Sequence, residues 1–329
     1  MQRATIGLML LIAFTGCSRP TPPASPALTE EDVVEALQRQ VAEQEVASAQ
    51  AVANYVSKIT TQFDDLDSPV DELLRQLPGV VQVEVLVKSE KPTHRIIHLR
   101  DWHFVPKELF AVGENEKNGR VLSDGEIDGL YQKFLLEVEL VQLEQTALLR
   151  CLIKHHGLKR VFAEGFSPKE LNAYRERIAA LKAMEEKQIP RVRQQLDEVR
   201  SLKDDGMDEK IRVIESQLQK MLSEHRVRML EMGAAGRLLI SGELGDVLPL
   251  EDGDTFDAAN PVSQNGLKFD PEKIKARHDA QVKAASNEGP VGFVILGGSH
   301  DLSESVRRMG GCEYLRVTTK GFSTFSPPP

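Results

Sequence analysis

The stretch that most constrains the fold of this chain combines a helix pattern, a glycine stop and a buried strand pattern. Ser123 to Glu126 form a capping box, and apolar residues recur at helical spacing over 130–152. Gly157 then supplies a left-handed helix end, and residues 158–165 are a short apolar run. A helix that stops at a glycine and leads into a buried strand is half of a parallel α/β unit.

Other strand patterns extend this unit into a sheet. Residues 95–100 contain branched apolar residues in sequence, residues 291–296 are an apolar run, and residues 314–319 predict a last strand. Residues 80–88 alternate in polarity, and the turn that follows them predicts a hairpin with 95–100. Pro249, in a further apolar run, favours an edge strand. The predicted fold class is therefore α/β, with a mostly parallel sheet flanked by helices.

Residues 167–232 differ from the rest because they are rich in charged helix formers. Apolar residues recur with a three-four-three spacing in two segments, and a polar turn at 203–206 separates them. Pro190 must kink or restart the first segment. Two helices that each bury one apolar seam form an antiparallel hairpin of the coiled-coil kind, so an inserted helical arm is predicted. The seams are Ile189, Val192, Leu196 and Val199, and Ile211, Ile214, Leu218 and Met221.

Residues 1–16 have the pattern of an export signal, with Arg3 before a short apolar core. That core is too short to span a bilayer as a mature helix. Residues 14–17 are similar to a bacterial lipobox, which implies cleavage before Cys17 and attachment of lipid to this cysteine. Ser18 in place of Asp favours the outer membrane within the bacterial cell envelope. A plain secretory signal is the alternative.

The remaining boundaries follow from changes in composition. Residues 17–29 are a Pro-rich tether, and residues 30–78 are an N-terminal helical segment. An α/β domain is expected over 79–320, with the insertion at 167–232, and a disordered tail over 321–329. The formal net charge is −9, and a basic stretch that would bind nucleic acid is missing from the sequence, so no nucleic-acid partner is expected.

Polar side chains follow three of the predicted strands. Asp101 and His103 come directly after the run 95–100, on one face if the backbone stays extended. Glu164 ends the second run, and His300 follows the third after two glycines. Ligands of open α/β sheets bind at the carboxyl ends of the strands, so we expect these four side chains to meet.

The four side chains suit two kinds of chemistry. His103, Glu164 and His300 could bind a divalent transition metal such as Zn, Mn, Fe or Co and leave a position for water. The metal would lower the pKa of that water and make it a nucleophile. In a metal-free version, His103 is the general base, and Glu164 or Asp101 orients it.

Residues beside these four are candidates for contact with a peptide or small-molecule ligand. Glycines let the backbone approach a ligand closely, and their amides can hold an anion. The other histidines are interpreted as structural or surface residues, with His98 as the first exception. Trp102 is expected to pack beneath the loop. The candidates for ligand contact are Arg100, Gly297, Gly298 and Ser299.

Three short motifs resemble the Tiki/TraB superfamily, which includes ChaN-type haem-binding lipoproteins and is similar to erythromycin esterases. They are Arg100 to His103, Phe162 to Gly165, and Gly297 to His300. The resemblance covers roughly residues 80 to 320. It implies an α/β core with helical insertions, and a site made of His103, Glu164 and His300.

The resemblance also implies two activities, and the sequence differs from the family pattern at two positions. Proteins similar to Tiki are metal-dependent proteases, whereas ChaN-like proteins bind haem through His and Tyr. Asp101 stands where the family usually has Glu. Arg100 stands where it usually has Gly, so this cation must point away from the pocket or enter it and weaken a metal.

Three functions follow from these observations. The first is an envelope-anchored lipoprotein with a metal-dependent hydrolase site, for which a peptidase is the candidate activity, and with Cys17 as its attachment to the membrane. The second is a ChaN-like haem-binding or iron-binding lipoprotein. The third is a non-catalytic envelope scaffold, in which the helical arm binds a protein partner and Arg100 has inactivated the site.

Overall fold

The computed structural model describes residues 65–77, 79–202, 207–259, 262–263, 266–267 and 270–325. The predictions for the signal peptide, the lipidated Cys17, the tether and the helical pattern up to residue 56 lie outside these residues. Within the described part of the chain, no helix combines the length and apolar character that crossing a membrane requires.

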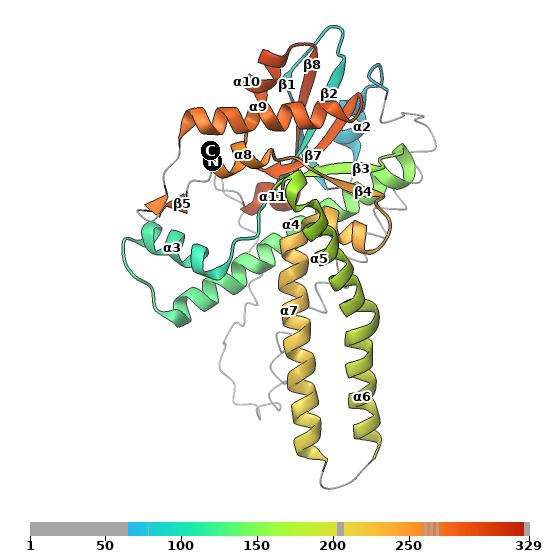
Figure 1. Ribbon diagram of the computed structural model, residues 1–329, viewed down its shortest axis with the longest axis vertical. Coiled ribbons are helices and arrows are strands. Elements are labelled where there is room, and N and C mark those ends of the chain that lie inside the picture. Colours follow the sequence, from blue (N-terminus) through green and yellow to red (C-terminus); the bar gives the residue numbers. More distant parts are fainter. Residues whose placement is uncertain are drawn as a thin grey trace, which may run out of the picture. The chain divides into compact units, whose positions relative to one another are not determined.

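A six-stranded sheet forms the centre of the fold (Figure 1). Its strand order is β1-β8-β2-β7-β3-β4, and every neighbouring pair is parallel except β1 and β8. The predicted fold class, α/β with a mostly parallel sheet, is thereby confirmed. Pro249 lies in the edge strand, as expected, where a missing N–H costs no ladder bond. The strands are β1 (Val80–Val87), β2 (His94–Asp101), β3 (Arg160–Ala163), β4 (Asp246–Pro249), β7 (Val291–Gly297) and β8 (Cys312–Thr319).

The predicted hairpin between the first two strands is wrong, because β8 lies between β1 and β2 and pairs with both. Strand β8 buries Tyr314 on one face and Leu315 on the other, so it requires a central position. Strand β1 leaves Val81 and Val85 exposed and forms the sheet edge.

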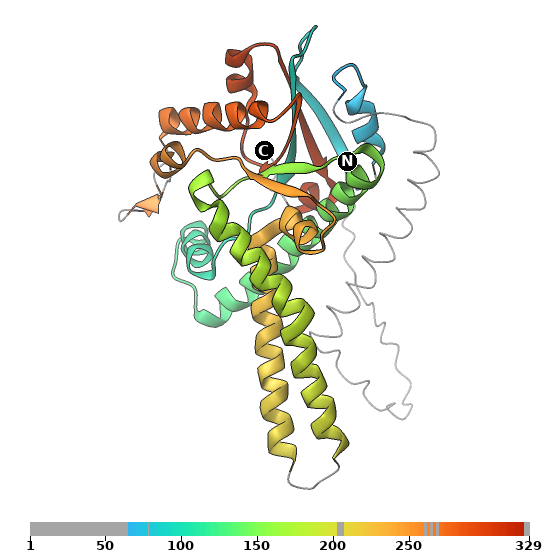
Figure 2. The same ribbon diagram turned by 45° about the vertical axis from the view of Figure 1, so that its right-hand side comes forward.

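Helices cover both faces of the sheet (Figures 1 and 2). Along the central strands, side chains alternate between two cores, with Ile97 and Leu99 in one and Ile96 in the other. The first core contains α2 (Val70–Gln76) and α4 (Asp124–His156), and the second contains α9 (Pro271–Asn287) and α10 (Ser303–Met309). Helix α4 begins at the Ser123 capping box and ends at Gly157 with φ 73°, both as predicted.

The insertion forms a two-helix arm that extends away from the sheet (Figures 1 and 2). Its first half is α5 (Leu171–Ala183), a π-helical segment (Met184–Gln188) and α6 (Ile189–Ser201). The π-helical segment lies directly before Pro190, which cannot donate a backbone hydrogen bond. The second half is α7 (Asp208–Ile240), which continues past the expected end at residue 232 but breaks at Gly233, where φ is 65°.

The end of the chain corrects the prediction of a disordered tail from residue 321. Residues Lys320–Phe325 form helix α11. The helix forms because Phe322 buries its ring, which is 5 % exposed, at the sheet edge that carries the candidate site. The remaining elements are α3 (Lys107–Asn118), a 3-10 turn (Pro168–Glu170), α8 (Gly253–Ala259), β5 (Val262–Ser263) and β6 (Gly266–Leu267).

Candidate functional site

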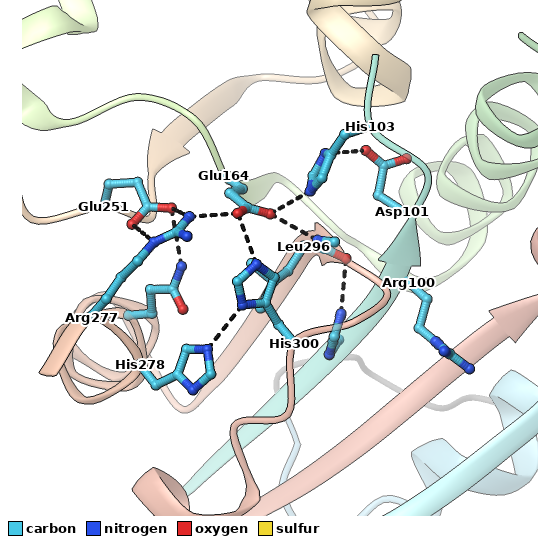
Figure 3. Close-up of polar contacts among 12 residues, drawn as sticks. Arg100, Asp101, His103, Glu164, Glu251, Arg277, His278, Leu296 and His300 are labelled. Carbon is cyan, nitrogen blue, oxygen red and sulfur yellow. Dashed lines mark hydrogen bonds and ion pairs between the residues drawn. The ribbon is translucent and has the colours of Figure 1, made fainter. Parts of the chain in front are cut away.

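The structure brings Asp101, His103, Glu164 and His300 together at the carboxyl ends of three neighbouring strands (Figure 3). Asp101 is the last residue of β2, and Glu164 directly follows β3. His300 follows β7 after a turn in which its own N–H donates to the carbonyl of Gly297 over 3.0 Å. Parallel strands place their carboxyl ends at one edge, which is why segments so distant in sequence meet.

Glu164 is the centre of this group. Its Oε2 lies 2.6 Å from Nε2 of His103, and its Oε1 lies 3.2 Å from Nε2 of His300. The other ring nitrogen of His103, Nδ1, lies 3.3 Å from Oδ2 of Asp101. The side chain of His103 is 43 % exposed, whereas those of the two carboxylates are 10–11 % exposed. His103 is therefore the member of the group that a ligand from solvent can reach.

The carboxylates set the protonation of His103. Burial acts to lower the pKa of His103, but the charge of Glu164 and the hydrogen bonds to Glu164 and Asp101 outweigh it and raise the pKa well above 6.5. Burial acts to raise the pKa of Glu164, but His103 and His300 hold it well below 4.5. The pairing therefore favours the imidazolium form of His103 and the carboxylate form of Glu164.

Gly297 and Gly298 bring the backbone close to the site. The N–H of Gly297 donates to Oε2 of Glu164 over 2.8 Å. A Cβ at Gly297 would lie 2.4 Å from Nε2 of His103, and one at Gly298 would lie 2.0 Å from the ring of Phe322. A side chain at either position would therefore have to displace the ring that it meets. Ser299, the third residue of the turn, is exposed.

Arg100 points away from the site, the first of the two orientations considered from the sequence (Figure 3). Its guanidinium donates to the carbonyl of Gly298 over 3.0 and 3.2 Å and lies 4.4 Å from the centre of the Phe322 ring. Trp102 contacts the same ring edge-on, as expected for a packing role. Arg100 therefore fixes the turn at the end of β7 and leaves the Glu164 cluster unblocked.

Sequence reasoning missed two charged members of the site, Glu251 and Arg277 (Figure 3). Nη2 of Arg277 donates to Oε1 of Glu164 over 2.5 Å and to Oε1 of Glu251 over 2.6 Å. Glu251 also accepts from Nε of Arg277 and from Gln281, and its side chain is fully buried. Glu251 follows the edge strand β4, so the strand-end rule that selected Glu164 could have found it.

His278 was also missed, and it contacts His300. Its Nε2 lies 2.9 Å from Nδ1 of His300. Burial, His300 and Arg277 lower the pKa of His278 to about 4, so its ring is neutral at physiological pH. Helix α9 carries both Arg277 and His278, and no local pattern in that helix indicates which of its faces covers the strand ends.

His98, singled out among the other histidines, belongs to the core. Its side chain is fully buried, and Nε2 donates to the carbonyl of Leu296 over 2.9 Å. Nδ1 therefore accepts from the hydroxyl of Tyr314, which lies 2.7 Å away. Burial lowers the pKa of His98 to about 3, so it stays neutral.

The arrangement of donors at Glu164 does not fit a divalent metal ion. Each carboxylate oxygen already accepts from two groups, and one of these groups is the permanent cation Arg277. Within the described residues, no group of three or more His, Cys, Asp or Glu side chains is disposed to hold a metal ion. The predicted metal stays a prediction from the sequence.

The predicted haem alternative lacks a tyrosine partner at these strand ends among the described residues. Tyr131 donates to the carbonyl of Val105, Tyr174 stacks on Phe166, and Tyr314 is bound to His98.

In comparisons with protein-family models, curated proteins and solved structures, nothing matched this chain.

Proposed function

We propose that this chain is a hydrolase in which His103 is the general base. The supporting observation is that carboxylates flank both ring nitrogens of His103 while the ring stays 43 % exposed. In its neutral form, the ring keeps its proton on Nε2, which donates to Glu164 over 2.6 Å. This leaves Nδ1, which makes the longer contact of 3.3 Å with Asp101, to accept a proton from an attacking water. Glu164 then stabilises the imidazolium that forms.

The attacking water adds to the carbonyl carbon of a peptide or an ester, and the bond that breaks is the acyl C–N or C–O bond. The imidazolium of His103 then returns its proton to the leaving nitrogen or oxygen. General-base catalysis by a positioned side chain typically contributes about 10²–10⁴-fold to a rate. We therefore expect His103→Asn to lower kcat/KM by this factor on a panel of p-nitrophenyl esters and fluorogenic peptides. His155→Asn, at an exposed position on α4, is the matched control and should leave the rate unchanged. Equal rates for wild type and His103→Asn would reject the role of His103.

We extend the proposal to distant membership of the Tiki/TraB superfamily. Its support is that the residues carrying the resemblance, Asp101, His103, Glu164 and His300, are neighbours in space. Proteins similar to Tiki depend on a metal. Assays with a chelator, and with added Mn²⁺, Co²⁺ or Zn²⁺, decide whether this chain shares that dependence. A haem titration with no Soret shift would exclude the ChaN-like alternative.

We also propose attachment to the envelope through Cys17, on the basis of the lipobox-like segment at 14–17. Cys17→Ala should move the protein out of the membrane fraction, and an unchanged distribution would count against the anchor.

A protein partner at the arm is supported by Leu202 and Val213, which are 59 % and 58 % exposed. Glutamate at both positions should abolish cross-linking of such a partner in cells.

A further inference from the structure

Arg277 connects the two buried carboxylates of the site. Its Nη2 bonds both Glu164 and Glu251, at 2.5 and 2.6 Å, and its Nε bonds Glu251 at 3.0 Å. The three side chains are 13 %, 10 % and 0 % exposed, respectively. Figure 3 shows the guanidinium between the carboxylates, on the side of Glu164 away from Asp101.

Buried carboxylates need a compensating cation, because losing water of hydration costs several kcal/mol for each ion. The site holds three carboxylates, those of Asp101, Glu164 and Glu251. Arg277 and the imidazolium of His103 supply the positive charge opposite them. A divalent ion would add two charges beside a guanidinium that stays protonated at every physiological pH. It would also have to displace donors that already fill the acceptor positions of Glu164.

We propose that the guanidinium of Arg277 takes the place that a metal ion holds in other sites made of histidine and carboxylate side chains. Wild-type protein then needs no metal to hold Glu164 between the two imidazoles. Removing the guanidinium leaves Glu164, Glu251 and the nearby rings of His103 and His300 as ligands for a divalent transition metal. This inference concerns the same site as the proposed function, but it does not require the site to be catalytic.

The test measures metal binding by the full chain with Zn²⁺, Mn²⁺ and Co²⁺ as probes. We expect no stoichiometric binding by wild type or by Arg277→Lys, which keeps the charge. Arg277→Ala should bind one ion, on the order of 100-fold more tightly than wild type, because the buried charge is then unpaired. Adding His300→Ala to Arg277→Ala should weaken binding by at least the roughly 10–100-fold that the loss of an outer-shell partner costs, because His300 is then a direct ligand. With Co²⁺, visible absorption reports the ligands directly.

Folding of the variant is read separately by circular dichroism and thermal unfolding. Zn²⁺ should raise the Tm of Arg277→Ala but not that of wild type, and free guanidinium should compete with the metal. If Arg277→Ala does not fold, Glu251→Gln/Arg277→Gln keeps the net charge unchanged and still frees Oε1 of Glu164 for metal.

Two results would overturn the inference. The first is wild-type protein that binds one ion and loses it on His103→Ala or His300→Ala. The second is folded Arg277→Ala, or folded Glu251→Gln/Arg277→Gln, that gains no metal affinity. Neither result depends on hydrolysis, so a failure of the hydrolase proposal would be seen separately, as an absence of His103-dependent activity.

Discussion

His103 donates from Nε2 to Oε2 of Glu164 over 2.6 Å, and this ion pair joins the ends of two strands that are far apart in the sequence. The same oxygen of Glu164 accepts the N–H of Gly297 from the strand between them. Glu164 therefore fixes both the charge and the position of the exposed ring. Four predictions follow, three from this ion pair and one from helix α11, whose Phe322 packs against Trp102.

The activity of the proposed hydrolase should rise with pH towards an alkaline limit. His103 must lose its proton to act as a base, and Glu164 and Asp101 keep its pKa well above 6.5. Glu164→Gln removes one of these charges, so the acidic limb of the pH profile of kcat/KM should move to lower pH. Lys169→Gln, at an exposed position in the 3-10 turn that follows β3, is the control. If the acidic limb of the pH profile of kcat/KM lies at the same pH in Glu164→Gln as in wild type, a group other than His103 limits the rate.

The stability contributed by the His103–Glu164 pair should also depend on pH. The pKa of His103 is raised on folding, so its contribution is fully present below pH 6.5 and is lost as pH rises through the folded-state pKa. The pKa of Glu164 is lowered, so its contribution is present above pH 4.5 and is lost as pH falls through the folded-state pKa. Urea unfolding of wild type and His103→Asn should therefore differ most between pH 4.5 and 6.5. A difference that grows above pH 7 would contradict the pairing.

Gly297→Ala should disable the site without unfolding the chain. The new Cβ would lie 2.4 Å from Nε2 of His103, so the ring must move away from Glu164. A displacement of about 1 Å can lower a rate by roughly 10²-fold. The measurement is kcat/KM together with the pKa of His103 by NMR. Gly129→Ala, where the added Cβ meets nothing within 4 Å, should leave both unchanged.

Phe322→Ala should destabilise the protein, although the residue lies close to the end of the chain. Its ring is 5 % exposed and contacts Trp102 and Arg100. Truncation of a buried Phe costs about 3–5 kcal/mol in the free energy of unfolding. Ser323→Ala, at an exposed position on the same helix, should change it by less than about 0.5 kcal/mol. Equal free energies for the two variants by urea unfolding would mean that α11 contributes nothing.

Much of the site could be predicted from local patterns. Asp101, Glu164 and His300 were selected because each follows an apolar run, and parallel strands align their carboxyl ends. The orientation of Arg100 was left open between two alternatives. Strand alternation permits the orientation in which Arg100 points away from the site. The hydrogen bonds from Arg100 to the carbonyl of Gly298 hold it in that orientation.

Other features depend on contacts between distant segments. Strand β8 pairs with both β1 and β2, which removed the predicted hairpin. Helix α11 forms where a disordered tail was predicted, because Phe322 reaches a site that only the folded sheet creates. Neither feature has a signal in the neighbouring sequence.

Local sequence patterns predicted the strands of the main sheet, the long helices of the core and arm, and four acid and imidazole groups, because capping, periodicity and strand ends are properties of neighbouring residues. The four groups are Asp101, His103, Glu164 and His300. That Arg277 and His278 face those groups follows only from the folded chain, since the rotation of α9 is set by its packing on the sheet. The tertiary structure also decided which cation lies beside Glu164, because the pairing of buried charges requires groups from separate elements to meet in one place.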